Sequence, residues 1–286
     1  MRSITILIAA LIFLSHSTAF SQITNGAISG GIGNAGRAAV DPGESAFMNP
    51  ASVAHLTTYY SAVHYDFVNH STEGDGNRLG LLLADGSEGN IVSGAFSYVK
   101  KNMEQENSTW SGQDFQLTAS GFVARPVAVG VSVHRWMSGA EDVNSNQDNV
   151  NLGFLITPSN SIGIGVVGYD LLNSDEAVPM IVRLKRTYAL AGHILLMERF
   201  RFRLDLVHPE TGNPGRRTEV MTGLESYFNE KFAFRLGGHW KETTDQMFVT
   251  TGIGFKGPRL SFDYSYQKDI RAGEGSRHMF DLWLPL

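Results

Sequence analysis

The stretch "VAVGVSVHRW", residues 127–136, decides the fold because its side chains alternate strictly in kind. One face of an extended chain here is all valine: Val127, Val129, Val131 and Val133. The other face is mixed: Ala128, Gly130, Ser132, His134 and Trp136. A period of two is the period that a β-strand imposes on its side chains. The stretch therefore predicts a strand with one face against an apolar medium.

The same alternation recurs in "RFRFRLDL" (199–206) and "RLSFDYSYQ" (259–267), and it extends over the chain from residue 58. It defines about fourteen strands. A count of twelve stays open, because a pattern places strand ends only to within a few residues. The predicted strands lie near 58–68, 78–84, 91–101, 113–124, 127–137, 148–157, 161–171, 181–194, 199–208, 218–228, 232–241, 247–256, 259–268 and 276–285.

Connections of two lengths alternate along the chain. Those after even-numbered strands are tight: residues 125–126, 158–160, 229–231 and 257–258. Those after odd-numbered strands are longer and polar: "NHSTEGDGN", "NMEQENSTWSG", "SGAEDVNSNQ", "HPETGNPGRR" and "DIRAGEGS". Bacterial outer-membrane barrels have short periplasmic turns and longer external loops, and in lipid only a closed sheet pairs every backbone group. We therefore predict an all-β fold, a transmembrane antiparallel β-barrel in the bacterial outer membrane. A secreted all-β sandwich or soluble barrel is the alternative.

The first residues have the pattern of a signal peptide. Met1-Arg2 supplies a positive start, Ile4 to Leu14 an apolar run, and Ala19-Phe20-Ser21 small residues at a cleavage site before Gln22. The chain has no cysteine, so packing and backbone pairing alone must hold an exported protein together. The predicted organisation is a signal peptide (1–21), an N-terminal segment (22–57) and the barrel (58–286).

The N-terminal segment, residues 22–57, contains "GIGNAGRAAVDPGESAFMNPASVAHL" at 31–56 and lacks the alternation of a strand. It is rich in glycine and alanine, which permit close backbone packing, and Asn49-Pro50 favours a turn. A barrel of about fourteen strands encloses more space than its own side chains fill, since filling by side chains works at about eight strands. We therefore expect the segment to fold into the lumen as a plug, and we call it the hatch.

The hatch sequence resembles the N-terminal hatch of the FadL/PorV group of outer-membrane proteins. The shared pattern is a Gly-Ala-Gly-like start, acidic residues with small neighbours, and then Asn-Pro-Ala with an apolar residue. Here it comprises Gly33, Ala35, Gly36, Asp41, Glu44, Asn49, Pro50, Ala51 and Val53. The resemblance implies passive uptake of a small hydrophobic molecule, fatty-acid-like or hydrocarbon, which leaves through a wall gap at the third strand. Gly94 lies at the centre of that strand. The PorV relatives imply the alternative of a non-transporting shuttle or scaffold for exported proteins.

Charged residues mark the inward face of the predicted strands eight to eleven: Arg183, Lys185, Arg201, Arg203, Asp205, Glu219, Glu225, Arg235 and His239. They are expected to form a cross-strand ladder that holds the hatch through Asp41 and Glu44, or a cationic strip for a ligand carboxylate. Inward aromatic residues would line an apolar pocket or pack on the hatch: Tyr60, Phe96, Tyr98, Phe122, Trp136 and Tyr169.

Several function classes find no support in the sequence. The nine histidines are scattered and no pair has metal-ligand spacing, so we expect no metal, no cofactor and no enzymatic activity. The net charge of −5 without a basic run argues against nucleic acid as a partner. The expected partners are outer-membrane lipid, a small hydrophobic molecule, the barrel-assembly machinery during biogenesis, and an exported protein in the scaffold alternative.

Overall fold

The computed structural model describes residues 24–69, 74–87, 91–105, 108–140, 143–174, 177–179, 182–210, 218–271 and 275–285. The predicted signal peptide lies outside the described residues. The strands are β1 (Tyr59–Asn69), β2 (Asp75–Asp85), β3 (Ser93–Gln105), β4 (Ser108–Ala124), β5 (Val127–Ala140), β6 (Val143–Ser159), β7 (Ile162–Tyr169), β8 (Thr187–Leu196), β9 (Phe200–Pro209), β10 (Glu219–Tyr227), β11 (Phe232–Lys241), β12 (Gln246–Lys256), β13 (Ser261–Asp269) and β14 (Ser276–Pro285).

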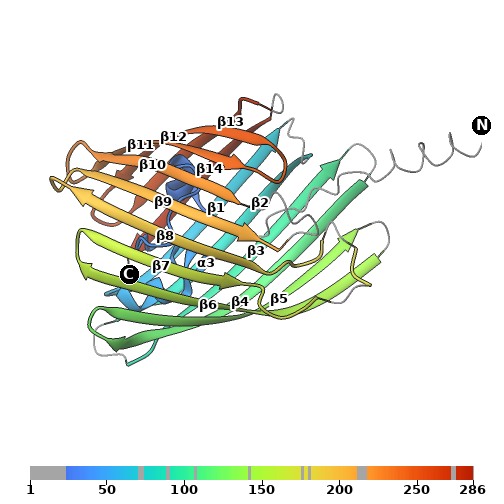
Figure 1. The fold of residues 1–286 in the computed structure, drawn as a ribbon, viewed down its shortest axis with the longest axis horizontal. Helices are drawn as coiled ribbons and strands as arrows, with labels where there is room; N and C mark the ends of the chain where they lie inside the picture. Colours follow the sequence, from blue (N-terminus) through green and yellow to red (C-terminus); the bar gives the residue numbers. More distant parts are fainter. Residues whose placement is uncertain are drawn as a thin grey trace, which may run out of the picture.

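The strands form a closed antiparallel barrel in which each pairs with its neighbours in sequence (Figure 1). β1 closes the ring against β14, with Tyr60 opposite Pro285 and Asn69 opposite Ser276. The predicted fold class is confirmed, the strand count is fourteen, and the alternative of an open sandwich is wrong. Closure agrees with the alternation. A sheet with an apolar outer face lies in lipid, where the backbone N–H and C=O groups of an open edge would have no hydrogen-bond partner.

The outer face of the barrel is apolar on every side. On β5, Val131 and Val133 are exposed while Ser132 and Trp136 are buried, as the opening stretch predicts. Exposed leucine, valine, isoleucine and phenylalanine also occur at outward-facing positions of the other strands, including Leu81, Leu117 and Phe234. Such an outward band is what a hydrocarbon environment requires of a spanning barrel. Among the described residues, no helix has the length and apolar character to cross a membrane.

Several connections differ from the prediction. Most of each stretch expected as a loop, at 102–112 and at 138–147, belongs to strands, because β3 runs to Gln105 and β4 begins at Ser108, while β5 runs to Ala140 and β6 begins at Val143. The predicted eighth strand at 181–194 starts only at Thr187. Val182 and Leu184 alternate with Arg183 as in a strand, but the two apolar side chains pack inside the mouth of the barrel. The β7–β8 connection is therefore much longer than its pattern suggests.

The described part of the hatch, residues 24–57, lies inside the ring of strands (Figure 1). It forms α2 (Ala27–Gly31), α3 (Ser45–Met48) and the 3-10 helix η1 (Pro50–His55). α2 packs on β11 to β14, and η1 packs on β3 to β6. Phe47 and Val53 share an apolar cluster with Ala62, Leu82 and Trp283 of the wall. The core of this protein is thus the contact between the hatch and the inner wall.

Candidate functional site

The hatch meets the wall backbone to backbone, and inward glycines make this approach possible. A Cβ added at Gly130 of β5 would lie 2.3 Å from the carbonyl carbon of Pro50. One at Gly237 of β11 would lie 2.4 Å from the backbone nitrogen of Gly33, which itself has a φ of +67°. These distances are far below van der Waals contact. Only glycine fits at Gly130 and Gly237, and at these two positions the hatch backbone lies directly against the wall.

The Asn-Pro-Ala motif ties the end of the hatch to β6. The Asn49 side chain accepts from Ala51 N at 3.0 Å and so caps η1, whose first residue is Pro50. Its amide nitrogen donates to Arg37 O at 2.8 Å and to Phe154 O at 3.1 Å. Gly153 leaves room for it, since a Cβ there would lie 2.1 Å from the Asn49 oxygen. Asn49, Pro50 and Ala51 thus position the hatch, and none of the three lines the lumen cavity described below.

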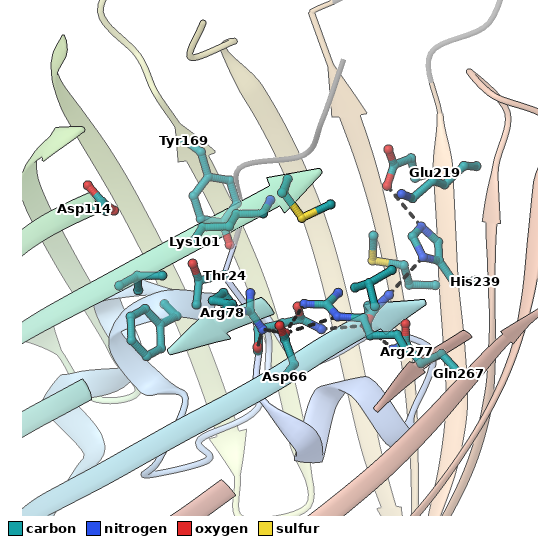
Figure 2. Close-up of a pocket in the computed structure, with 18 of the residues that line it drawn as sticks. Thr24, Asp66, Arg78, Lys101, Asp114, Tyr169, Glu219, His239, Gln267 and Arg277 are labelled. Atoms are coloured by element: carbon teal, nitrogen blue, oxygen red, sulfur yellow. Dashed lines mark hydrogen bonds and ion pairs between the residues drawn. The ribbon is translucent and has the colours of Figure 1, made fainter. Parts of the chain in front are cut away.

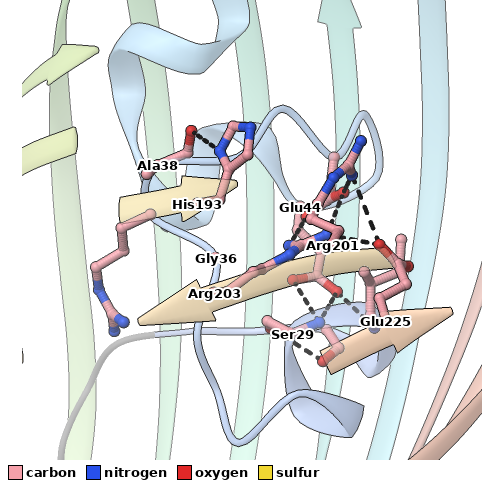
Figure 3. Close-up of polar contacts among 12 residues, drawn as sticks. Ser29, Gly36, Ala38, Glu44, His193, Arg201, Arg203 and Glu225 are labelled. Atoms are coloured by element: carbon pink, nitrogen blue, oxygen red, sulfur yellow. Dashed lines mark hydrogen bonds and ion pairs between the residues drawn. The ribbon is translucent and has the colours of Figure 1, made fainter. Parts of the chain in front are cut away.

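A buried ladder of ion pairs crosses β9, β10, β11 and β13 and includes one residue of the hatch. The Arg203 guanidinium pairs with Asp41 of the hatch and with Glu225 at 3.1 Å. The Arg235 guanidinium contacts Glu225 at 2.8 Å and Asp263 at 2.7 Å. Arg201 lies further out, 3.6 Å from Glu225 (Figure 3). The structure therefore gathers Arg201, Arg203 and Arg235 around Glu225, and Arg201 and Arg203 also reach Asp41, as the predicted ladder requires.

Several members of the predicted ladder lie elsewhere. Lys185 precedes β8, Asp205 pairs with Arg37 of the hatch at 3.0 Å, and Glu219 pairs with His239 at 3.0 Å. Glu44 contacts no wall arginine among the described residues; its carboxylate accepts from the backbone N–H groups of Ile28, at 2.8 Å, and Ser29, at 3.1 Å (Figure 3). Arg183 lies before β8 and donates to Val178 O at 3.0 and 2.7 Å. The predictions for Glu44 and Arg183 were wrong because each depends on contacts between segments far apart in the chain, which an alternation pattern does not predict.

Glu44 is buried inside the hatch. Its carboxyl stands next to the start of α2, where Asp281 of β14 also accepts from Ala27 N at 2.6 Å. Burial, together with the nearby charges of Asp281 and Asp41, raises the pKa of Glu44 to about 7. Its carboxyl is therefore half protonated near neutral pH.

Glu44→Gln is expected to remove a loss of stability that the wild type suffers as pH rises. The folded pKa of Glu44, about 7, lies above the ordinary value of 4.5. The stability from its protonated form is thus fully present below the ordinary value and is lost as pH rises through about 7. Glutamine keeps the oxygen acceptor for Ile28 and Ser29 without the charge. Thermal melts from about pH 5 to about pH 8 measure this. The wild-type Tm should fall relative to the variant, and parallel curves would contradict the assignment.

A cavity of about 140 Å³ lies between the hatch and the loop end of the barrel (Figure 2). Asp66 of β1, Arg78 of β2 and Lys101 of β3 line it as register partners on three neighbouring strands. Arg78 contacts Asp66 at 2.5 Å, and Arg277 of β14 donates to the same carboxylate from Nε at 3.2 Å. We call these four residues the cationic row. Like charges directly opposite each other destabilise a sheet, so Arg78 and Lys101 make this wall favourable to an anion.

The rest of the cavity combines two further kinds of surface. Two acid–histidine groups line the other sides: His239 lies 3.0 Å from Glu219, and His134 lies 2.9 Å from Asp114 and 3.0 Å from Asp170. Apolar residues lie between the polar groups: Phe47, Val68, Val99, Met103, Trp136, Leu184, Met221 and Phe248. The cavity can therefore contact both a charged group and an apolar body.

The cationic row was missed at the sequence level. Asp66, Arg78, Lys101 and Arg277 do occupy inward positions of alternating strands, and that alternation was the available signal. Their approach depends on strand register and on the closure of β1 against β14, which the pattern does not supply.

The predicted inward aromatic residues divide into two groups. Trp136 and Tyr169 are buried in the lumen, and Tyr60 packs on Trp283. Phe96 lies on the outer face at 39% exposure, with Tyr98 on the same face two residues on, and Phe122 is exposed beside His55. The lumen placement of Phe96 was wrong because both faces of β3 carry apolar residues, so the pattern leaves its direction undecided.

Gly94 does not interrupt the wall. It pairs with Asp85 of β2, as the last pair of that ladder, and with Ala119 of β4, and neither register shifts at this point. A Cβ at Gly94 would meet nothing nearer than Thr118 O at 3.8 Å. The prediction of a gap at this residue was therefore wrong. Among the described residues, no group of three or more His, Cys, Asp or Glu side chains is arranged to hold a metal ion.

A scan against protein-family models and a search of curated protein sequences give no match. The toluene transporter TbuX of Ralstonia pickettii matches with a TM-score of 0.76 at 11% identity, over 93% of this chain and 100% of its own. The monoaromatic hydrocarbon channel CymD has a TM-score of 0.75 at 12% identity, over 94% and 99%. A Pseudomonas aeruginosa FadL homologue has 0.66 at 13%, over 93% and 99%.

TbuX and CymD are a transporter and a channel rather than enzymes, and no scaffold protein is among the neighbours described here. Identities this low establish a common architecture. The chain therefore has the fold of the FadL-type outer-membrane barrels, as its hatch sequence predicts, and that fold is the one expected of a multi-pass protein of the bacterial outer membrane.

Proposed function

We propose that this protein is an outer-membrane channel for passive uptake of a small amphiphilic molecule, with an apolar body and an anionic group. The observation that carries the proposal is the cavity above the hatch, where the cationic row faces Phe47, Val99 and Trp136. Charge-assisted hydrogen bonds from arginine suit a carboxylate, and the apolar residues suit a hydrocarbon body. The architecture shared with hydrocarbon channels supports the transport role.

The wall at Gly94 is paired with both neighbouring strands and offers no side exit there, so we infer that passage beyond the cavity occurs through a movement of the hatch. The hatch fills the lumen between α2 on β11 to β14 and η1 on β3 to β6. Among the described residues, its hydrogen bonds to the wall each involve a side chain and form no strand ladder. Some are single, such as Gly33 N to Thr250 Oγ1 at 2.9 Å, and others are grouped, such as Gly36 N, Arg37 N and the Arg37 guanidinium to Asp205 Oδ2, each at 3.0 Å. These can break one after another without unfolding the barrel. The scaffold alternative has no observation of its own in its favour.

Benzoate influx tests the proposal, with Lys101→Met and Lys100→Met as a matched pair. Lys101 faces the cavity, whereas Lys100 is exposed on the outer side of the same strand. Proteoliposomes at about pH 8 keep benzoate ionised, because a free carboxyl has a pKa near 4. The wild type should admit labelled benzoate faster than empty liposomes. Lys101→Met should slow influx about tenfold, the effect of one charge-assisted contact, and Lys100→Met should leave it unchanged.

Toluene, which has the same ring without the carboxylate, serves as competitor. If the apolar body binds in the same cavity, excess toluene slows benzoate influx in the wild type. Influx of benzoate at the rate of empty liposomes, or equal rates in the two lysine variants, would rule out the proposed function.

A further inference from the structure

The β7–β8 connection lies across the inner face of β6 at the mouth of the barrel. We call its described residues 170–174, 177–179 and 182–186 the strap. Among the described residues, β7 pairs with β6 only between Leu152 and Ser159, so the described loop end of β6 has no strand partner on that side. Inward side chains of β6 hold the strap instead. Leu172 N donates to Asn149 Oδ1 at 2.7 Å, and Gln147 Nε2 donates to Val182 O at 2.9 Å.

Beneath the strap is a strongly apolar part of the inner wall. Trp110 of β4 and Trp136 of β5 meet edge to face at 6.4 Å between ring centroids, and Met103 of β3 joins them. The Trp136 ring lies over Gly112, where an added Cβ would come within 2.1 Å of it. Other inward residues of β5 are small or polar, such as Ser132 and His134. Three large apolar side chains together in a polar lumen require an apolar cover, because water contact with them is unfavourable.

The strap supplies that cover from its own chain. Val178, Val182 and Leu184 pack on the two tryptophans and Met103, and Val182 has no exposed surface. Trp136 Nε1 donates to Val182 O at 3.1 Å, and Leu184 N donates to Gln147 Oε1 at 3.0 Å. These are side-chain contacts to the strap backbone rather than a strand ladder, so they break without disturbing the barrel wall.

We propose that Met103, Trp110 and Trp136 form a binding site for an apolar, ring-sized group, which Val182 and Leu184 occupy until such a group displaces them. Met103, Trp136 and Leu184 also line the cavity that contains the cationic row, so the two sites are continuous. A ligand whose apolar body replaces Leu184 can place its anionic group toward Arg78 and Arg277. Aromatic side chains with a sulfur neighbour favour a flat apolar group. This inference rests on the proposed function for the nature of the ligand, but it concerns binding and not passage.

Tryptophan quenching by bromobenzene tests the site directly. Two of the four tryptophans are in it, and Trp240→Phe in every sample removes a reporter on the outer face. The strap variant is Val182→Ser with Leu184→Ser, which keeps the strap length and the backbone groups that contact Trp136 and Gln147. Leu172→Ser, at an exposed strap position, is the control. The half-saturating bromobenzene concentration should fall about tenfold in the strap variant, as expected for removal of buried aliphatic side chains that compete for the site. It should stay unchanged in the control.

Two results would overturn the inference. One is coincident quenching curves for the wild type and the strap variant, with circular dichroism showing both folded. The other is saturable quenching that persists after Trp110→Phe with Trp136→Phe. If the strap variant does not fold, Leu184→Ala alone takes its place, with a smaller shift in the same direction. Quenching needs no transport, so a failure of benzoate influx with the expected quenching would refute the channel and leave the site standing.

Discussion

Arg203→Met is expected to lower the free energy of unfolding by about 3–5 kcal/mol, because it leaves the buried carboxylate of Asp41 without its close partner and removes one of the arginines around Glu225. Arg203 is 1% exposed and contacts Asp41 of the hatch and Glu225 of β10. Arg201 and Arg235 still contact Glu225, but among the described residues Asp41 retains only the distant Arg201, at 4.0 Å, as a charged partner. The hatch should therefore loosen before the barrel does. Urea unfolding in lipid measures the lost free energy. Protease cleavage in the hatch at urea concentrations where the barrel is still folded would show that the hatch loosens first.

Arg203→Lys is the conservative variant for this prediction, and Arg135→Met is the control at an exposed ion pair. Lysine keeps the charge but not the planar fork that reaches Asp41 and Glu225 together, so its loss should be intermediate. Arg135 pairs with Asp148 on the exposed rim at 2.7 Å, where solvent screens the attraction, so Arg135→Met should cause no measurable change. Equal stabilities for the Arg203 and Arg135 variants would show that the buried ladder does not hold the hatch.

Gly130→Val is expected to unseat the hatch and open the barrel to small solutes. The new Cβ would lie 2.3 Å from Pro50 C and 2.5 Å from Ala51 N, both backbone atoms that cannot turn aside as a side chain does. Overpacking of this kind costs about 1–3 kcal/mol, which corresponds to about a tenfold or larger rise in the fraction of open molecules. Conductance across a planar lipid bilayer measures that fraction.

Gly94→Val is the matched control, since it makes the same substitution in the neighbouring part of the wall. Gly94 faces outward, and its added Cβ would come no closer than 3.8 Å to Thr118 O. It should leave conductance at the wild-type level. Wild-type conductance and unchanged thermal stability of Gly130→Val would mean that η1 accommodates the new side chain. The close glycine contacts would then not be what holds the hatch in place.

Local chemistry was enough to predict the class of fold. The valines of β5 and the apolar positions of β9 and β13 face outward, and the fourteen strands come in the predicted order. The alternation predicts the outward positions correctly because an apolar residue on the outer face needs only the hydrocarbon around it, and not a particular partner residue. The same holds for the small residues of the hatch, which suit close packing wherever the chain finally lies.

Residues that depend on a distant partner were not predictable in this way. Val182 and Leu184 alternate like strand residues but cover Trp136, and Phe96 faces outward although its neighbours Ala95 and Val99 are also apolar. The partner of Glu44 is the backbone of α2 and not a wall arginine.

By itself, then, the sequence determined a closed barrel of about fourteen strands with an apolar exterior, because a period of two is a local property of each strand. The structure settled the count at fourteen. Only the tertiary structure decided which inward charges meet, as in the cationic row of Asp66, Arg78, Lys101 and Arg277. That outcome depends on the register between strands and on the closure of β1 against β14. Both are relations between segments far apart in the chain, which no single segment encodes.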